Sequence, residues 1–149
     1  MRVRESSRAF IINEKDEVLL QQFIFREVID EKILWVTPGG GIEIGESSEE
    51  ALKREIYEEL GIVIIPDNTD IKLELDVKIN GKNETFISRE TYYKIFLNSD
   101  TPINIELMSQ NEKSSFKSWK WFNKNEIHEL ESKNIVAPKN ISKYIWEKC

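Results

Sequence analysis

The clearest pattern in the chain is an alternation of apolar and charged residues over positions 71–79. A period of two predicts a strand with one buried face. Asn80-Gly81 follows directly, and this dipeptide is a strong hairpin signal. Residues 85–97 are therefore expected to form the return strand of a hairpin.

Shorter apolar segments predict further strands, separated by polar turns and loops. Residues 9–12 and 18–25 flank a polar turn, which predicts a strand, a turn and a strand. The other expected elements are a short strand at 33–36, a long loop at 100–118 with a helical turn near 111–115, an aromatic strand at 119–122, a capped helix at 123–130 and an amphipathic helix at 141–146. Because strands and helices mix without strict βαβ alternation, we expect a mixed sheet packed between helices.

Residues 48–60 have the spacing of an amphipathic helix. Three apolar residues recur there at every fourth position and form a stripe that can be buried: Leu52, Ile56 and Leu60. Ser47 or Ser48 suits the N-cap, acidic residues follow in the first turn, and Gly61 is placed as a C-terminal stop.

Three glutamates lie on the arc next to this stripe: Glu55, Glu58 and Glu59. Like charges at that spacing destabilise a helix by about 0.2–0.5 kcal/mol per pair. A divalent cation would remove this repulsion, because Mg²⁺ and Mn²⁺ take oxygen ligands and complete their shell with water and substrate phosphates. The cluster therefore predicts a metal site that recruits a phosphate ester. The alternative is that a Glu-rich helix is simply a solvated face.

The residues around the acidic patch favour the metal site. Residues 38–45 contain a glycine cluster, whose backbone can approach a ligand without side-chain obstruction, and they lead directly into the helix. Arg54 precedes the patch, where it can orient Glu58 or reach a phosphate oxygen.

This stretch resembles the Nudix box. The pattern of that box is a Gly, five intervening residues, a Glu, seven intervening residues and then the run Arg-Glu-apolar-x-Glu-Glu-x-Gly-apolar. The nine fixed positions within 23 residues all match: Gly40, Glu46, Arg54, Glu55, Ile56, Glu58, Glu59, Gly61 and Ile62. Less specific resemblance to small bacterial Nudix proteins runs over most of the chain. It implies an α/β (α+β) fold, an α/β/α sandwich with a mixed central sheet, and a single Nudix domain over residues 1–149.

The resemblance also implies a metal-dependent pyrophosphohydrolase that cleaves a nucleoside diphosphate linked to another moiety, such as a nucleoside triphosphate, a nucleotide sugar or a dinucleotide. By this resemblance Glu58 and Glu59 are ligands of Mg²⁺ or Mn²⁺. Glu55 is either a further ligand or the group that positions or deprotonates the attacking water. The carbonyl of Gly39 is an additional expected ligand, and Arg54 would hold the glutamates in place.

Many Nudix enzymes place one more carboxylate outside the box, on a loop ahead of the last strand. Glu112 is the candidate here, because it lies in the long loop a few residues before the aromatic strand. Glu106 is the rival, and a solvated loop acid is the alternative for both. Glu46 is expected to brace the loop of the box against the helix.

Three further residues are candidates for contact with the substrate: Trp35, Arg89 and Tyr92. An Arg with aromatic neighbours can clamp a phosphate or stack on a base. The alternative for the aromatic residues is packing, which is their usual role in strands. The only histidine, His128, is expected on a surface helix and is assigned no catalytic role.

The net charge and the composition limit the binding partners and the cellular location that we expect for the protein. A net charge of -6 argues against affinity for bulk nucleic acid, although a small anion bridged by a metal stays compatible. No apolar run approaches the length of a membrane span, no signal-peptide core is evident, and a cytoplasmic location is expected. The single cysteine, Cys149, has no internal disulfide partner. Apolar and aromatic faces are compatible with a homodimer.

Two alternative functions belong to other classes. A protein with this fold can act as a nucleotide-binding or regulatory module without turnover, and loss of box glutamates would mark that class. All three glutamates are present, so the enzyme is favoured. Isomerisation of a prenyl diphosphate would need added acid/base groups, commonly a cysteine near the site, and Cys149 at the terminus does not suit that role.

Overall fold

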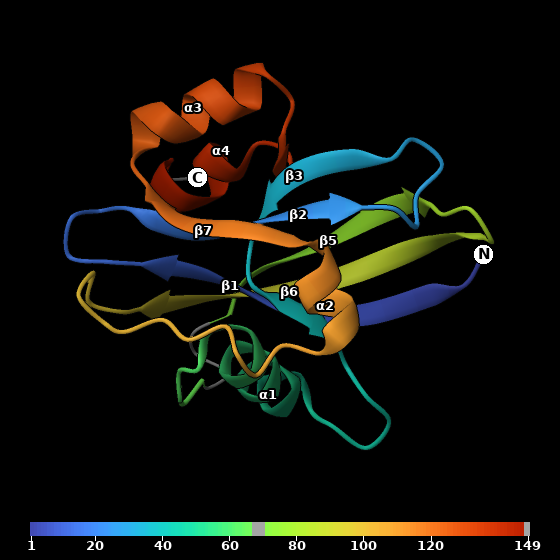
Figure 1. Cartoon of the computed structure of the whole chain (residues 1–149), viewed down its shortest axis with the longest axis horizontal. Coiled ribbons are helices and arrows are strands. Elements are labelled where there is room, and N and C mark those ends of the chain that lie inside the picture. Colours follow the sequence, from blue (N-terminus) through green and yellow to red (C-terminus); the bar gives the residue numbers. More distant parts are fainter. Residues whose placement is uncertain (67–70, 148–149) are drawn as a thin grey trace.

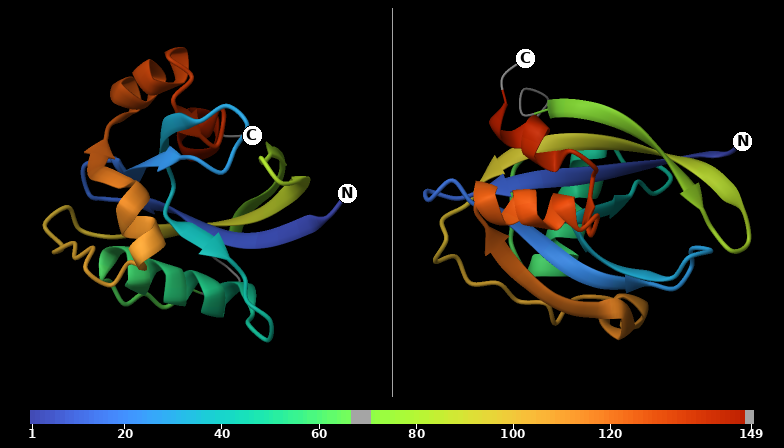
Figure 2. Two further views of the ribbon diagram at one scale, coloured as in Figure 1. Left: turned by 45° about the vertical axis from the view of Figure 1, so that its right-hand side comes forward. Right: turned by 90° about the horizontal axis from the view of Figure 1, so that it is seen from above.

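The central sheet is curled and mixed, and helices cover both of its faces (Figure 1). The computed structural model describes residues 1–66 and 71–147. The strands are β1 (Val3–Ile12), β2 (Val18–Phe25), β3 (Lys32–Val36), β4 (Gly39–Gly41), β5 (Ile71–Asn80), β6 (Thr85–Phe96), β7 (Phe116–Phe122) and β8 (Val136–Ala137). The helices are α1 (Ser48–Leu60), α2 (Gln110–Ser115), α3 (Lys124–Ser132) and α4 (Ile141–Trp146). Helix α1 covers one face and α3 and α4 cover the other (Figure 2), which confirms the predicted sandwich.

Strand β1 has different partners along its two edges. Strand β6 pairs with it in parallel over its full length, from Val3 opposite Ile87 to Ile12 opposite Phe96. On the other edge, β4 pairs with β1 around Ser7, and β2 pairs with it at Ile12. The sheet order is β5-β6-β1-β2-β3-β8, with β7 paired to β2. Strand β4 therefore brings the glycine segment to the centre of the sheet, shortly before α1 begins.

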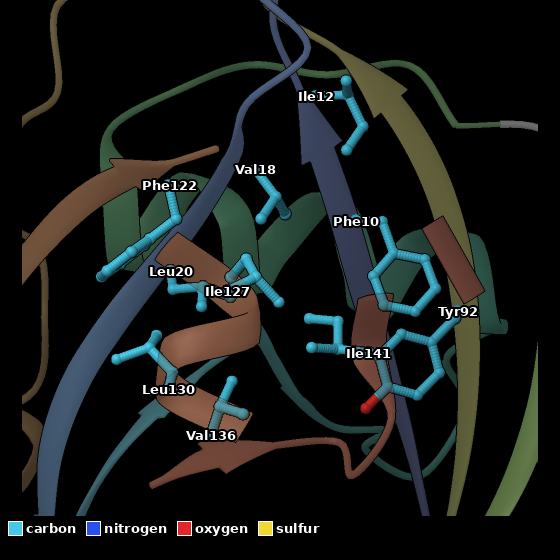
Figure 3. Close-up of a cluster of buried hydrophobic side chains, with 10 residues drawn as sticks. All are labelled: Phe10, Ile12, Val18, Leu20, Tyr92, Phe122, Ile127, Leu130, Val136 and Ile141. Atoms are coloured by element: carbon cyan, nitrogen blue, oxygen red, sulfur yellow. The ribbon is translucent and has the colours of Figure 1, made fainter. Parts of the chain in front are cut away.

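Side chains alternate between the two faces of β1, so the strand contributes to two hydrophobic layers. The layer that includes residues of α3 and α4 consists of Phe10, Ile12, Val18, Leu20, Tyr92, Phe122, Ile127, Leu130, Val136 and Ile141 (Figure 3). The layer that includes α1 consists of Ala9, Ile11, Leu19, Leu52, Ile56, Leu60, Ile62, Ile64 and Tyr93. Burying a large apolar side chain contributes about 1.5–3 kcal/mol. The predicted stripe of α1 therefore anchors the helix to the sheet.

Most predicted elements are confirmed, and the differences lie at strand ends and in short strands. Strand β1 begins at Val3 rather than at residue 9, because β6 supplies hydrogen-bond partners to its polar first half. Strand β7 begins at Phe116 and shortens the predicted loop. The residues Gly39–Gly41 were expected in a loop but form β4, since the backbone of β1 pairs with them. Strand β8 was not predicted, and it pairs in parallel with β3.

The predicted helix at residues 48–60 and the predicted hairpin of β5 and β6 are both confirmed, with Asn80 opposite Thr85 at the hairpin end. In the part of the chain that the structure describes, no helix is both long and apolar enough to cross a membrane. Cys149 lies outside the described residues.

Candidate active site

Helix α1 is fixed at both ends by local hydrogen bonds. The Ser47 side chain accepts from the Glu50 backbone N–H at 3.1 Å, and the Glu50 carboxylate accepts from the Ser47 N–H at 3.0 Å, which is a capping box. At the other end, Gly61 has φ 68° and donates its N–H to the carbonyl of Tyr57. Glycine adopts this left-handed conformation at low cost, which is why it commonly ends a helix. These ends set the position of every glutamate on the helix.

Three carboxylates from two helices converge beside β4. Glu55, Glu59 and Glu112 each offer an oxygen atom, and these oxygens lie within 4.8 Å of one another. Glu55 and Glu59 are one turn apart on α1. Glu112 comes from the first turn of α2, where its carboxylate also accepts the backbone N–H of Ser109 at 3.3 Å. The long segment before β7 therefore carries a third carboxylate to the glutamates of the box.

The glycines of β4 allow this close approach. The N–H of Gly39 donates to Glu59 Oε1 at 2.8 Å. A Cβ atom at Gly40 would lie 2.5 Å from the carboxyl carbon of Glu55, so only a glycine leaves that carboxylate in place. The backbone of β4 thus forms one wall of the carboxylate cluster.

Burial and mutual repulsion make the cluster unfavourable for negative charge. Burial raises the pKa of Glu59 well above its ordinary value, the charge of Glu55 raises it further, and the Gly39 N–H opposes the shift. Burial also raises the pKa of Glu55, against the effect of Arg54. A cation held by these oxygens would offset both effects. An all-carboxylate donor set suits Mg²⁺ or Mn²⁺.

Arg54 connects the loop of the box to the cluster. Its guanidinium donates to both oxygens of Glu46, at 2.7 and 2.9 Å, to Glu55 Oε1 at 2.9 Å and to the carbonyl of Gly41 at 2.9 Å. The hydrogen bonds from Arg54 lower the pKa of Glu46 to about 2. Arg54 therefore lies where it was expected to hold the glutamates in place, and Glu46 lies where it was expected to brace the loop of the box against the helix.

The remaining predicted carboxylates lie outside the cluster of three. Glu58 is at its rim, with its carboxylate 3.5 Å from the guanidinium of Arg54 and 39% of its side chain exposed. Glu106 is 79% exposed and lies 3.7 Å from the ammonium of Lys113. Of the two candidates in the long loop, the structure brings only Glu112 to the cluster.

The three candidates for substrate contact each have protein partners. Arg89 donates to the carboxylate of Asp76 at 2.9 and 3.0 Å on the exposed surface. Tyr92 is 1% exposed and stacks on Phe10, with 4.6 Å between ring centroids. Trp35 packs edge-on against Phe122, as part of the layer under α3 and α4. These contacts favour packing for Tyr92, and substrate contact by Trp35 and Arg89 stays a prediction.

Arg8 and Glu90 were not singled out from the sequence, although they lie close behind β4. The Arg8 guanidinium donates to the carbonyl of Thr37 at 2.9 Å and lies 3.3 Å from the Glu90 carboxylate. The sequence did carry a signal for Arg8. This charged residue lies two positions before Phe10 and so shares the face of β1 that is buried, where a charged side chain is unusual unless it is paired.

Comparisons with known proteins extend over nearly the whole chain. A family model described as the NUDIX domain matches residues 3–143. An RNA pyrophosphohydrolase of Nitrobacter winogradskyi is 30% identical over 119 residues, which covers 74% of this chain and 70% of the relative. An RNA pyrophosphohydrolase of Erythrobacter litoralis is 27% identical over 140 residues, which covers 87% of this chain and 82% of the relative.

Two solved structures are similar in fold. The MutT protein from Methanosarcina mazei Go1 has a TM-score of 0.67 and 21% identity, and the match covers 97% of this chain and 91% of that one. A NUDIX hydrolase from Nitrosomonas europaea has a TM-score of 0.66 and 19% identity, with 98% and 88% covered. At these identities the likeness concerns the fold alone.

Proposed function

The chain belongs to the NUDIX family, and from this premise we propose that it is a metal-dependent pyrophosphohydrolase of a nucleotide-type diphosphate, acting at the cluster of Glu55, Glu59 and Glu112. As a Nudix hydrolase, it hydrolyses phosphoric anhydride bonds. The observation that carries the proposal is the convergence of three carboxylates from two helices, with the least exposed of them held by the backbone of β4. Such a cluster is costly without a cation and well suited to one.

The proposed cofactor is Mg²⁺ or Mn²⁺, with oxygens of Glu55, Glu59 and Glu112 as ligands and Glu58 and the Gly39 carbonyl as further candidates. When bound, such an ion would neutralise charge on the phosphates and lower the pKa of a bound water. The protein's own contribution is to hold the carboxylates. The Gly39 N–H orients Glu59, and Arg54 orients Glu55 while it fixes the loop of the box.

Glu55 is also a candidate for the group that accepts a proton from the attacking water. Its side chain is 13% exposed and its carboxylate lies against Gly40, so burial raises its pKa. A general base is most effective when its pKa is shifted toward the working pH. Arg54 opposes this shift and keeps one carboxylate oxygen occupied, so the other oxygen is the one available to a water.

The relatives named RNA pyrophosphohydrolases add RNA to the candidate substrates. The backbone of RNA is joined by phosphodiesters, so a phosphoric anhydride occurs only at a polyphosphorylated end. An enzyme of that kind has to bind a short terminus rather than a long duplex, and a net charge of -6 does not oppose this. The candidates are therefore a phosphorylated RNA end, a nucleoside triphosphate, a nucleotide sugar and a dinucleotide.

The test is turnover by the purified protein, with and without Mg²⁺, against a panel of these four substrate types. Glu59→Gln serves as the inactive variant, and Glu129→Gln, an exposed glutamate on α3, is the matched control for loss of one charge. We expect turnover that needs the metal, falls by orders of magnitude in Glu59→Gln and is unchanged in Glu129→Gln.

Full activity in Glu59→Gln would contradict the proposed site. Nucleotide binding without turnover of any panel member would favour the regulatory module over the enzyme. The single domain over residues 1–149, a homodimer and a cytoplasmic location stay predictions.

A further inference from the structure

A buried carboxylate that the proposed chemistry does not use lies in the sheet behind β4. Glu90 on β6 is 8% exposed. Its Oε1 accepts the hydroxyl of Tyr92 at 2.9 Å, its Oε2 accepts the hydroxyl of Ser88 at 3.0 Å, and the same oxygen lies 3.3 Å from Nε of Arg8. Glu90 is thus the common partner of three polar groups on β1 and β6.

The parallel register of β1 and β6 produces this arrangement. Ser6 lies opposite Glu90, and Arg8 lies opposite Tyr92. Alternate residues of neighbouring strands share a face of the sheet, so Arg8, Glu90 and Tyr92 are gathered on one side. We call these three residues the Glu90 network.

The Glu90 network holds the segment that leads into β4. Arg8 donates to the carbonyl of Thr37 at 2.9 Å, and the same guanidinium lies 3.3 Å from the Glu90 carboxylate. Thr37 itself is 1% exposed. The carbonyl of Thr37 is therefore held by a partner of Glu90.

From Thr37 the chain passes directly to the carboxylate cluster. The carbonyl of Pro38 accepts the N–H of Ala9 at 3.0 Å, and the next N–H, that of Gly39, donates to Glu59 at 2.8 Å. Gly39 has φ +140°, and a Cβ atom there would lie 2.2 Å from the carbonyl oxygen of Ser7. Only Pro38 lies between Thr37, which Arg8 holds, and Gly39, whose N–H holds the most buried carboxylate of the cluster.

A contribution to the stability of the fold does not by itself explain why charged residues are buried in the Glu90 network. Two of its neighbours are apolar, because Phe10 stacks on Tyr92 and Leu75 lies opposite Glu90 on β5. Replacing a buried ion pair by apolar residues of similar volume is often neutral or stabilising. A role in positioning explains why the charged residues occupy this place.

We propose that Arg8, Glu90 and Tyr92 are positioning residues, which orient the Thr37–Gly39 backbone and, through the Gly39 N–H, the Glu59 carboxylate for binding a divalent cation. This inference rests on the proposed function, because it assigns the network a role at that metal site. Partners that orient metal ligands typically contribute 10–100-fold to metal affinity or activity.

The test is direct titration of Mn²⁺ by electron paramagnetic resonance, with the melting temperature of the metal-free protein and the values of kcat and KM as further readouts. Arg8→Lys keeps the positive charge beside Glu90, but its single ammonium cannot contact both Glu90 and the Thr37 carbonyl in the geometry of a guanidinium. Glu90→Gln is the second variant. Arg2→Lys is the matched control, because Arg2 forms an exposed ion pair with Glu84 beside the same strand.

We expect Arg8→Lys to weaken Mn²⁺ binding at least about tenfold and to lower kcat more than it raises KM, with a melting temperature close to that of the unaltered protein. Arg2→Lys should change none of these. A lower melting temperature with unchanged Mn²⁺ affinity in Arg8→Lys would overturn the positioning role and leave the proposed function intact. Failure of the unaltered protein to bind Mn²⁺ would overturn the proposed metal site, and the role of the network with it.

Discussion

At the scale of single residues, Glu59 has to satisfy two opposing requirements. It is 4% exposed and lies beside Glu55 and Glu112, so its charged form is unfavourable in the metal-free protein. A ligand of a cation must nevertheless carry that charge. The Gly39 N–H offsets only part of the cost, and the metal-free fold is therefore expected to be less stable than the same fold with a neutral side chain here.

Replacing Glu59 by Gln should raise the melting temperature of the metal-free protein by a few degrees, because the amide removes a buried charge and its oxygen can still accept the Gly39 N–H. The same variant should lose the increase in melting temperature that Mg²⁺ gives the unaltered protein. Thermal unfolding with and without Mg²⁺ measures both effects. A lower melting temperature without metal would mean that the Glu59 charge stabilises the fold.

The lowered pKa of Glu46 predicts that the folded protein loses stability at acid pH. Its two hydrogen bonds from Arg54 lower its pKa from the ordinary value of 4.5 to about 2. A lowered pKa in the folded state gives stability that is fully present above pH 4.5 and is lost as the pH falls toward 2. Glu46→Gln should therefore flatten the loss of stability over this range, whereas Glu129→Gln should not. Urea unfolding at a series of pH values tests this, and parallel curves for Glu46→Gln and the unaltered protein would contradict it.

Among the helices and strands, the sequence predicts best the elements that have a capping or terminating residue at their ends. Helix α1 has a capping serine at one end and Gly61 at the other, and both bounds were predicted. Strand β4 has no such signal, because glycines have low strand propensity and its pairing comes from β1, some thirty positions earlier in the chain. The Glu90 network was missed for the same reason, since it depends on the parallel register of β1 and β6.

Adjacent glycines in β4 give a sharp test of that strand's role. An added Cβ at Gly40 would lie 2.5–2.7 Å from the carboxylate atoms of Glu55, whereas no atom of the described residues lies within 4 Å of one at Gly41. Gly40→Ala should displace the carboxylate of Glu55, which is the flexible end of that side chain. We expect kcat to fall by about 100-fold, because a shift of a catalytic group by about 1 Å can cost that much. Gly41→Ala should leave kcat unchanged. Melting temperatures of both variants should stay close to that of the unaltered protein, and equal kcat values in the two variants would show that Glu55 need not lie against β4.

At the scale of the whole molecule, the candidate site is assembled from distant segments. The box supplies Glu55 and Glu59, and α2 supplies Glu112 from beyond the hairpin of β5 and β6. The sequence located the third carboxylate in the long loop but left Glu106 and Glu112 as alternatives. Both are acids of the same long segment, and the packing of α2 against β2 places Glu112, rather than Glu106, near Glu55 and Glu59.

Glu112→Gln should lower kcat at least about tenfold, since removing even an outer partner of a metal site typically costs that much. The amide can still accept the Ser109 N–H, so α2 should keep its cap. Glu106→Gln should stay within about twofold, because an exposed ion pair contributes little. Steady-state kinetics at saturating Mg²⁺ compares the two, and a larger loss in Glu106→Gln would reverse the assignment.

The parallel pairing of β1 with β6 also has a consequence for how the chain folds. Val3 meets Ile87 and Ile12 meets Phe96, so the central strand pairs with a segment made much later in synthesis. Contacts between residues so far apart in sequence slow folding, because the intervening chain must be ordered before they form. On the ribosome, the box and α1 emerge while one edge of β1 still has no partner strand. Growing chains that end before β6 therefore expose one unpaired edge of β1, whose second half is apolar, and such an edge promotes aggregation.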